Sequence, residues 1–506
     1  MSGLGALDPT ERTAAAVAAA GVLLAATVVL IGGAPVAWVL LAYVGALSAA
    51  ARFVQLRRGR YFEPLTIIAA VGLTSFAARP LDLFLNVSEL LSWHYEESDV
   101  ERLIHIDNQE IALFVTRELQ DGLAPALTRT MAAVALFMTL VVAGYLLPVG
   151  RRLAAKLAHV GSGVAGRMDV NVVVAVCLVI ALIGQVAVLV KVGGITAAAD
   201  NMLHQSVLNA GLAYQTLLGF GTAGLLIWAA WSPPTSTRAR VAFALVTAEV
   251  CAYYAVAGSR TRVVLTLIAL AVITHYVWRP WRLRWVVGAV VAVVVFAAAL
   301  LGVRQATREE TIGDAITAAP AYIADPRGVL NDMTEFDNLF MATSVIGSPH
   351  EYHRPAPFQY GGGFVDALYS YVPGRIAPDK PEGGDIEFRK IVWGGELKAG
   401  RPYTAVGDFW NDFGFPGVIV GALLFGLLAR ILLGLVEAQA RGPGREYRVV
   451  LYAIGLVVLY VELTTTYSVA MGIVITMLLP TLVAIHVLRP LGERLRLERL
   501  LPRPSG

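Results

Sequence analysis

Apolar residues in this chain gather in blocks of about twenty, separated by polar connections. A helix of about twenty residues spans the roughly 30 Å hydrocarbon core of a bilayer. Backbone groups inside lipid must be paired, which favours helices over an open sheet. The pattern therefore predicts an all-α polytopic membrane protein with about twelve spans, near residues 13–31, 34–52, 63–79, 128–149, 170–190, 209–231, 241–257, 262–278, 285–303, 413–435, 448–465 and 468–487.

Arginine-rich segments follow every second predicted span. They read "LRRGR", "GRRLAAK", "TSTRAR", "RPWRLR" and "RGPGREYR", and the tail "RPLGERLRLERLLPRP" continues the series. Short loops rich in Lys and Arg face the cytoplasm. We therefore predict that both termini are cytoplasmic and that the remaining connections face outward. Only five of the forty basic residues are lysine, a composition that suggests a bacterial genome, so we expect a multi-pass protein of a bacterial plasma membrane.

Composition agrees with this class. Of 506 residues, 57% are hydrophobic and 15% are charged, whereas a soluble chain carries about 25% charged residues. The first apolar run follows "LDPTER" and lacks a basic start and a cleavage site, so we interpret it as a retained span. Cys177 and Cys251 both lie inside apolar runs, which predicts small apolar core residues and not a loop disulfide.

Two outward connections are long and divide the chain into three parts. Residues 1–303 would hold nine spans, with an external amphipathic segment at 80–127. Residues 304–412 would form a large extracytoplasmic loop, and loops of that length are usually functional. Residues 413–506 would hold three spans and a basic cytoplasmic tail.

The long loop is acidic overall, with ten Lys or Arg and sixteen Asp or Glu over residues 304–412. It is therefore not a general surface for nucleic acid. Its bases cluster nonetheless, with aromatic residues between them. Arginine forks bind phosphate and aromatic faces pack on sugars, so we expect sugar stacking on Tyr371, Tyr403 and Trp410. An ordinary folded cap with solvated charges is the alternative.

The turn "AGSRTR" places Arg260 and Arg262 on the predicted outward side, where positive charge is uncommon. One interpretation is that both side chains extend to external water. The other is that they bind an anion at the membrane boundary.

The loop enters the tenth predicted span through "YTAVGDFWNDFGFPGVIVG", from Tyr403 to Gly421. Gly414 and Gly417 permit a tight bend there. Upstream, "YVPGRIAPDKPEGGDIEFRK" holds three prolines and three glycines, which predicts an ordered irregular loop and not a long helix.

Three elements together resemble the bacterial O-antigen and oligosaccharide repeat-unit polymerases of the Wzy type. They are Gly258-Ser259-Arg260, then Pro378-Asp379-Lys380-Pro381, then Thr404 to Gly417 with Gly407, Phe413 and Gly414. The ordering covers roughly residues 170–490. The resemblance implies a helical glycosyltransferase-C-like architecture, shared with O-antigen ligases and the SEDS peptidoglycan polymerases.

The resemblance also implies a reaction. A polyprenyl-diphosphate-linked glycan is the donor, and a lipid-linked repeat unit is the acceptor whose hydroxyl attacks the anomeric carbon. A flippase and a chain-length regulator would be partners, and no cofactor is needed. The ligases would show an external His before the late span, and residues 355–416 contain none, which favours a polymerase.

The residues themselves, apart from the resemblance, indicate how a diphosphate would be bound. A departing diphosphate needs fixed cations, and the sequence has no acidic pair or cluster with metal spacing; His350 and His353 lack a third ligand. We therefore expect metal-independent binding of the diphosphate by basic side chains. The expected set is Arg260, Arg262, Arg304, Arg375, Lys380 and Arg389.

A general base would assist the acceptor hydroxyl. Asp408 is the first candidate because it lies in the entry to the tenth span, and Asp385 and Glu387 are alternatives. Glu249 and Glu462 lie within predicted spans. Intramembrane carboxylates are functional candidates, although we favour a structural role for these two as hydrogen-bond partners facing the bundle interior.

Three further function classes remain as alternatives. An O-antigen-ligase-like enzyme would use the same donor. A polyprenyl-phosphate-sugar glycosyltransferase would carry acids in its first external loop, whereas "GGAP" has none. A transporter of lipid-linked glycan would show two similar halves with broken spans at matching positions, and we detect no such repeat.

Overall fold

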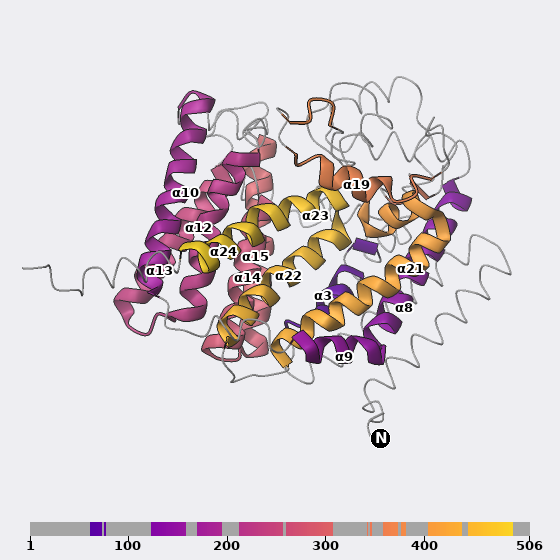
Figure 1. Cartoon of the computed structure of the whole chain (residues 1–506), viewed down its shortest axis with the longest axis horizontal. Coiled ribbons are helices and arrows are strands. Elements are labelled where there is room, and N and C mark those ends of the chain that lie inside the picture. Colours follow the sequence, from indigo (N-terminus) through magenta and orange to yellow (C-terminus); the bar gives the residue numbers. More distant parts are fainter. Residues whose placement is uncertain are drawn as a thin grey trace, which may run out of the picture. The chain divides into compact units, whose positions relative to one another are not determined.

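In the computed structural model, nearly all of the described part of the chain is helical (Figure 1). The described residues are 61–72, 75–76, 123–157, 169–194, 212–256, 260–306, 342, 345–346, 358–372, 376–380, 403–437 and 444–488. The main helices are α3 (Pro64–Val71), α8 (Leu123–Leu146), α9 (Pro148–Leu157), α10 (Val170–Val192), α12 (Leu212–Trp231), α13 (Thr237–Val256), α14 (Arg260–Ile273), α15 (Leu283–Ala306), α19 (Gly362–Tyr369), α21 (Thr404–Glu437), α22 (Arg445–Thr464), α23 (Tyr467–Ile473) and α24 (Leu479–Val483). Three π-helical turns, η4 (Thr274–Trp278), η6 (Val474–Leu478) and η7 (Ala484–Leu488), continue α14, α23 and α24.

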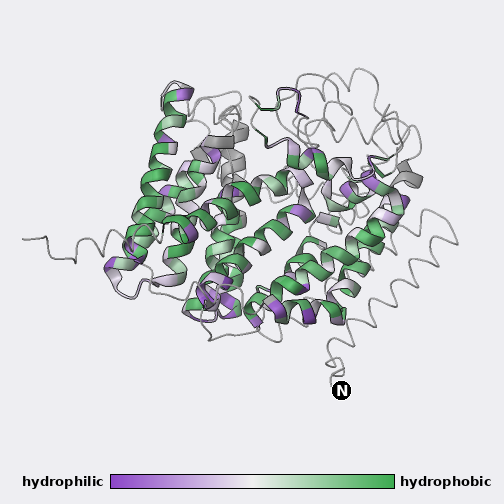
Figure 2. Ribbon diagram, in the orientation of Figure 1, coloured by the Kyte–Doolittle hydropathy of each residue, from purple (hydrophilic) through white to green (hydrophobic). Residues whose placement is uncertain are grey.

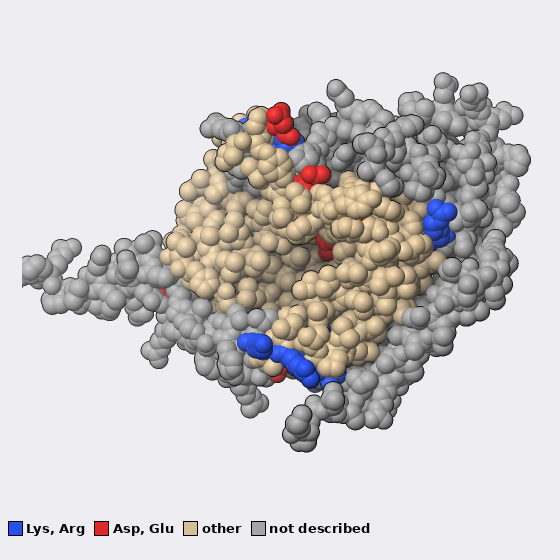
Figure 3. Space-filling view, turned by 45° about the vertical axis from the view of Figure 1, so that its right-hand side comes forward, with Lys and Arg blue, Asp and Glu red and all other residues tan. Residues whose placement is uncertain are grey.

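Six described helical segments are long and apolar enough to cross a membrane. Their hydrophobic residues run along most of each ribbon in Figure 2, and charged side chains are sparse on the described part of the face in Figure 3. The segments are Arg129–Leu146, Val170–Lys191, Thr261–Trp278, Thr404–Glu437, Arg445–Thr464 and Tyr467–Leu488. The chain is therefore a multi-pass α-helical membrane protein.

Helices also form at other predicted spans. The helices α12, α13 and α15 occupy the predicted spans 209–231, 241–257 and 285–303. The first two predicted spans and the external segment 80–127, up to residue 122, lie outside the described residues. The total of twelve spans and the predicted three-part division remain predictions.

The chain divides into two compact units that interleave along the sequence. Unit 1 comprises Met1–Ala154, Asp325–Leu433 and Leu459–Ala470, and unit 2 comprises Ala155–Ala324, Gly434–Val458 and Met471–Gly506.

In unit 1, α8 packs closely against α21 through glycines on both helices. A Cβ on Gly144 would lie 2.3 Å from the Leu423 carbonyl oxygen, and one on Gly426 would lie 2.0 Å from that of Val141. Only glycine permits so close an approach of two backbones, a common feature of membrane helix pairs. The buried Phe137 ring lies 6.0 Å from the Phe425 ring on α21 and fixes the same contact.

In unit 2, α10, α12 and the last helices share one apolar core. Val173 and Cys177 of α10, Ile227 of α12 and Ile485 of η7 are buried within it. Gly219 lets α12 approach η6, because a Cβ there would lie 1.8 Å from the Thr476 carbonyl oxygen. Both cysteines are free; Cys177 is a buried core residue as predicted, whereas Cys251 is only partly buried.

The predicted bend at the entry to the tenth span is confirmed. Within α21, Gly414 has φ 64° and ψ −147°, values outside any helix. Gly417 and Gly421 then approach residue Phe409, whose carbonyl oxygen would lie 2.1 Å from a Cβ on Gly417. The segment Thr404–Phe413 is therefore a separate short helix that folds back beside residues 415–437. The latter segment is about 35 Å long at 1.5 Å per residue, enough to span a bilayer.

Candidate functional site

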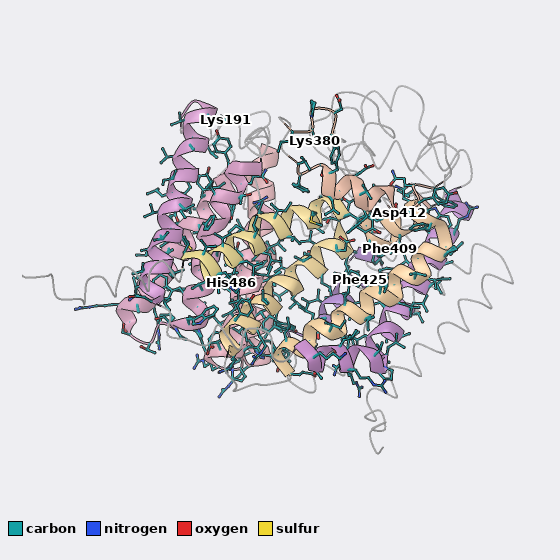
Figure 4. All side chains as sticks on the ribbon, viewed as in Figure 1. Lys191, Lys380, Phe409, Asp412, Phe425 and His486 are labelled. Atoms are coloured by element: carbon teal, nitrogen blue, oxygen red, sulfur yellow. The ribbon has the colours of Figure 1, made fainter. Side chains whose placement is uncertain are left out.

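Two carboxylates, Asp408 and Asp412, lie one turn apart on the short helix Thr404–Phe413 of unit 1. Their exposed fractions are 4% and 3%. A buried carboxylate is costly without hydrogen-bond donors. The donors that each carboxylate binds therefore show which helices it holds in place. Figure 4 labels Asp412 together with its neighbour Phe409 on α21.

Asp408 caps the N-terminus of α23. Its Oδ2 accepts a hydrogen bond of 2.8 Å from the backbone N–H of Tyr467, the first residue of α23. Tyr403 donates a second hydrogen bond to the same carboxylate. A helix N-terminus exposes unpaired N–H groups and a partial positive charge, so both partners stabilise a buried acceptor.

Asp412 performs the same task for α19. Its Oδ1 accepts a hydrogen bond of 3.2 Å from the backbone N–H of Gly363, in the first turn of that helix. The preceding residues bind the end of the short helix as well, since the N–H groups of Gln359 and Tyr360 each donate at 2.9 Å to the carbonyls of Asn411 and Asp412. Segment 358–372 of the predicted external loop is thus docked on α21.

The other end of α19 is also fixed. Lys380 Nζ donates to the carbonyls of Ser370 at 2.7 Å and Val372 at 3.1 Å. The Tyr371 hydroxyl donates to the Ser468 carbonyl in α23 at 2.5 Å. The structure thus engages Lys380 and Tyr371 with protein carbonyls, while their predicted roles in binding diphosphate and sugar stay predictions.

Glu462 is a residue whose relation to this site sequence reasoning missed. It lies half-buried in the last turn of α22 and interacts electrostatically with Asp408. Three carboxylates therefore gather where α21, α22 and α23 end or begin. The sequence offered one clue to this relation: Glu462 precedes Tyr467, the residue that binds Asp408, by only five residues.

Aromatic rings surround this acidic cluster of Asp408, Asp412 and Glu462. The Tyr467 ring meets those of Phe409 and Phe364 edge-on, at 5.7 and 5.9 Å between centroids. Of the predicted sugar-stacking residues, Tyr403 and Trp410 are buried. Trp410 packs edge-on against Phe415 across the bend, 4.7 Å between centroids. Whether either ring also contacts a sugar stays a prediction.

Thr404 marks the start of the short helix as strained. Its φ is 71°, a region that a β-branched residue rarely occupies. Its side chain is fully buried, and its Oγ1 has no hydrogen-bond partner among the described residues. Such backbone strain costs on the order of 1–3 kcal/mol and clusters at functional sites. This observation independently singles out the same short helix.

In unit 2, Arg262 is held by two neighbouring helices. Its Nη2 donates to Gln215 Oε1 of α12 at 2.8 Å, and its guanidinium lies 5.9 Å from the centre of the Tyr254 ring of α13. Tyr214, the residue next to Gln215, has Lys191 Nζ of α10 at 5.1 Å from the centre of its ring. These contacts fix the orientation of Arg262. They are compatible with extension toward external water and with binding of an anion.

The remaining predicted site residues are less defined. Arg260 is the first residue of α14 and Arg304 lies in the last turn of α15; their side chains lie outside the described part. Four predicted residues lie wholly outside it, namely Arg375, Asp385, Glu387 and Arg389.

Glu249 has the hydrogen bond expected of a structural residue. Gln185 Nε2 of α10 donates to Glu249 Oε1 at 2.6 Å, which joins α10 to α13. The side chain is nevertheless exposed, so the expected place in the bundle interior is not confirmed, although its hydrogen bond links α13 to the nearly buried Gln185.

Over the described residues, no group of three or more His, Cys, Asp or Glu side chains has a geometry that could hold a metal ion. Comparison with protein-family models, with curated proteins and with solved structures gave no match to this chain. The fold and the site thus define a polytopic helical membrane protein with a buried acidic cluster at the ends of its last spans.

Proposed function

We propose that this protein polymerises lipid-linked oligosaccharide repeat units at the outer face of the plasma membrane. An acceptor hydroxyl oxygen bonds to the anomeric carbon of a polyprenyl-diphosphate-linked glycan, and the bond from that carbon to the diphosphate breaks. The hydroxyl proton passes to a carboxylate, and polyprenyl diphosphate leaves. The glycan grows by one repeat unit, and the reaction as proposed uses no oxidant, nucleotide or metal ion.

The acidic cluster of unit 1 is the observation that carries the proposal. Carboxylates buried among membrane helices are energetically costly, and they commonly serve function. Here three of them meet beside a docked segment of the external loop, on a short helix with a strained first residue. The same short helix forms most of the Thr404–Gly417 element that resembles the polymerases, which supports the proposal.

Asp408 is assigned the role of general base. A carboxylate offers about four acceptor positions, and the Tyr467 N–H and Tyr403 hydroxyl occupy two. Capacity for a substrate hydroxyl therefore remains. A positioned base contributes about 10²–10⁴-fold to such a reaction. Since Asp408 is almost fully buried, an acceptor sugar reaches it only after some displacement of the residues packed around it.

We assign binding of the diphosphate to basic residues. In unit 2, Arg262 is pre-oriented by Gln215 and Tyr254, and Arg260 stands two residues earlier at the start of α14. A planar guanidinium binds phosphate oxygens through two parallel hydrogen bonds, which a lysine cannot reproduce. Arg260→Lys should therefore lower polymerisation, and Arg260→Ala should lower it further. Full-length polymer from an Arg260→Ala, Arg262→Ala double variant would exclude this role.

Reconstitution tests the function directly. The purified full-length chain is placed in proteoliposomes with a lipid-linked repeat unit, and the products are separated by length. A ladder of lengthening glycans supports the proposal. Transfer to an unrelated acceptor would indicate a ligase, addition of one sugar a monosaccharide transferase, and movement across the bilayer without new bonds a transporter. Each of these three results would overturn it.

A further inference from the structure

The exposed face of α19 is apolar. Phe364, Val365, Leu368 and Tyr369 have exposed fractions of 49%, 61%, 45% and 45%. Their spacing of i, i+1, i+4 and i+5 places them on one side of the helix. Ala367, between them, is 2% exposed and faces the protein. A helix at a water-facing surface has the opposite arrangement, with polar residues outward.

This apolar face continues onto a membrane-spanning helix of the same unit. The exposed Tyr360 ring precedes α19 and meets the exposed Phe413 ring edge-on, 6.3 Å between centroids. Phe413 lies at the bend of α21. Beyond the bend, exposed residues recur every four positions along the span, at Val420, Leu424 and Leu428. That periodicity describes one stripe, and on a span such a stripe faces lipid.

We propose that α19 lies in the boundary layer of the bilayer, with its apolar face among the lipid acyl chains. The occupant of the surface is thus phospholipid. The contact between Tyr360 and Phe413, at the bend that leads into the exposed α21 stripe, supports lipid over a soluble partner. The two tyrosines at the edges of the face, Tyr360 and Tyr369, suit the headgroup level, where tyrosine is enriched.

Placement of α19 in lipid would fix the depth of the acidic cluster. The N-terminus of α19 is bonded to Asp412 through Gly363, and the residue two positions beyond its C-terminus, Tyr371, is bonded to α23. The helix is therefore tied at both ends to the elements that hold Asp408. An interfacial helix resists movement along the membrane normal, since raising it exposes apolar area at about 25 cal/mol per Å². This role does not depend on which reaction the cluster performs.

Spin-label accessibility tests the proposal on the full-length chain in phosphatidylcholine nanodiscs. Single cysteines replace Val365 and Leu368 in a background where Cys177 and Cys251 are alanine. The matched control is Asp379→Cys, an exposed polar position after α19. All three positions lie on the surface, so substitution leaves no internal cavity, and an unchanged size-exclusion profile verifies folding.

The expected result is that labels at Val365 and Leu368 collide more with oxygen, which concentrates in lipid, than with an aqueous nickel chelate. The label at Asp379 should show the reverse. Access of the nickel chelate to Val365 and Leu368 equal to that at Asp379 would overturn the proposal. Protection from both reagents would mean that protein covers the face. Dipolar broadening between labels would identify that protein as a second copy of this chain.

Discussion

The capping role of Asp408 can be separated from its proposed chemical role by two substitutions at one position. Asp408→Ala removes the acceptor for both the Tyr467 N–H and the Tyr403 hydroxyl. Asp408→Asn keeps an oxygen for the Tyr467 N–H, and its new amide N–H₂ can donate to the Tyr403 oxygen. The first variant therefore tests structure, whereas the second removes the carboxylate and keeps the hydrogen bonds.

The magnitudes differ enough to be measured. A buried donor left without a partner costs about 1–3 kcal/mol, so Asp408→Ala should destabilise unit 1 by about 2–6 kcal/mol through its two donors. Asp408→Asn loses the attraction between a charge and the N-terminus of α23, about 0.3–2 kcal/mol, and it also removes the repulsion of Asp408 by Glu462 and Asp412, so its net cost in stability should be small. Polymerisation should behave differently. Removal of a general base should slow Asp408→Asn by about 10²-fold or more.

Two measurements on the same preparation check this. Thermal unfolding in detergent, followed by loss of the monodisperse size-exclusion peak, should rank wild type near Asp408→Asn and well above Asp408→Ala. Rates of chain growth in proteoliposomes should place Asp408→Asn far below wild type. Asp412→Asn is the matched control, since Asp412 is equally buried and caps α19, and it should keep both stability and most of the rate.

Equal stability of the alanine and asparagine variants would refute the capping argument. Normal polymer from Asp408→Asn would remove Asp408 from the mechanism and leave Asp385 or Glu387 to test.

Three further predictions concern the bend, the α19 end and the topology. Gly414→Ala should destabilise the protein by about 1–3 kcal/mol, because only glycine adopts that backbone conformation and a Cβ would lie 2.8 Å from the Phe358 ring; Gly288→Ala, where nothing lies within 4 Å, should unfold at the wild-type temperature or above. Lys380→Met should speed hydrogen exchange in residues 370–372, and unchanged exchange would mean that its two hydrogen bonds do not hold the end of α19. A thiol at Asp379, an exposed position of the predicted external loop, should react with an impermeant reagent added outside intact cells, and one at Gly442 should not; the opposite labelling pattern would mean that the topology is inverted.

Several parts of this architecture could be predicted from sequence because they depend on local pattern. Blocks of about twenty apolar residues located most of the long helices that the structure describes, whereas α9, α19 and the short helix Thr404–Phe413 were not predicted. Gly414 and Gly417, set in "FGFPG" between polar and apolar stretches, located the bend. Asp408 was chosen as a site residue from the same entry segment. Each of these inferences depends on neighbours along the chain.

The partners of Asp408 and Asp412 could not be predicted in this way. Tyr467 is 59 residues from Asp408, and Gly363 is 49 residues from Asp412. No periodicity records which helix N-terminus a carboxylate will meet. Aromatic residues posed a related difficulty, since residue type does not reveal exposure. Tyr403 and Trp410 suit a sugar surface by type, yet both are packed inside the protein.

The long-range caps have a consequence for biosynthesis. When Asp408 leaves the ribosome, the N–H that will bind it belongs to a residue 59 positions later, so the carboxylate enters the membrane before its partner has been made. The hydrogen bond from the Tyr371 hydroxyl to the Ser468 carbonyl likewise forms only after 97 further residues have been synthesised. The site is thus completed only when the final helical hairpin inserts. A nascent chain arrested before α23 would therefore hold an Asp408 carboxylate with Tyr403 as its hydrogen-bond donor but without the Tyr467 N–H.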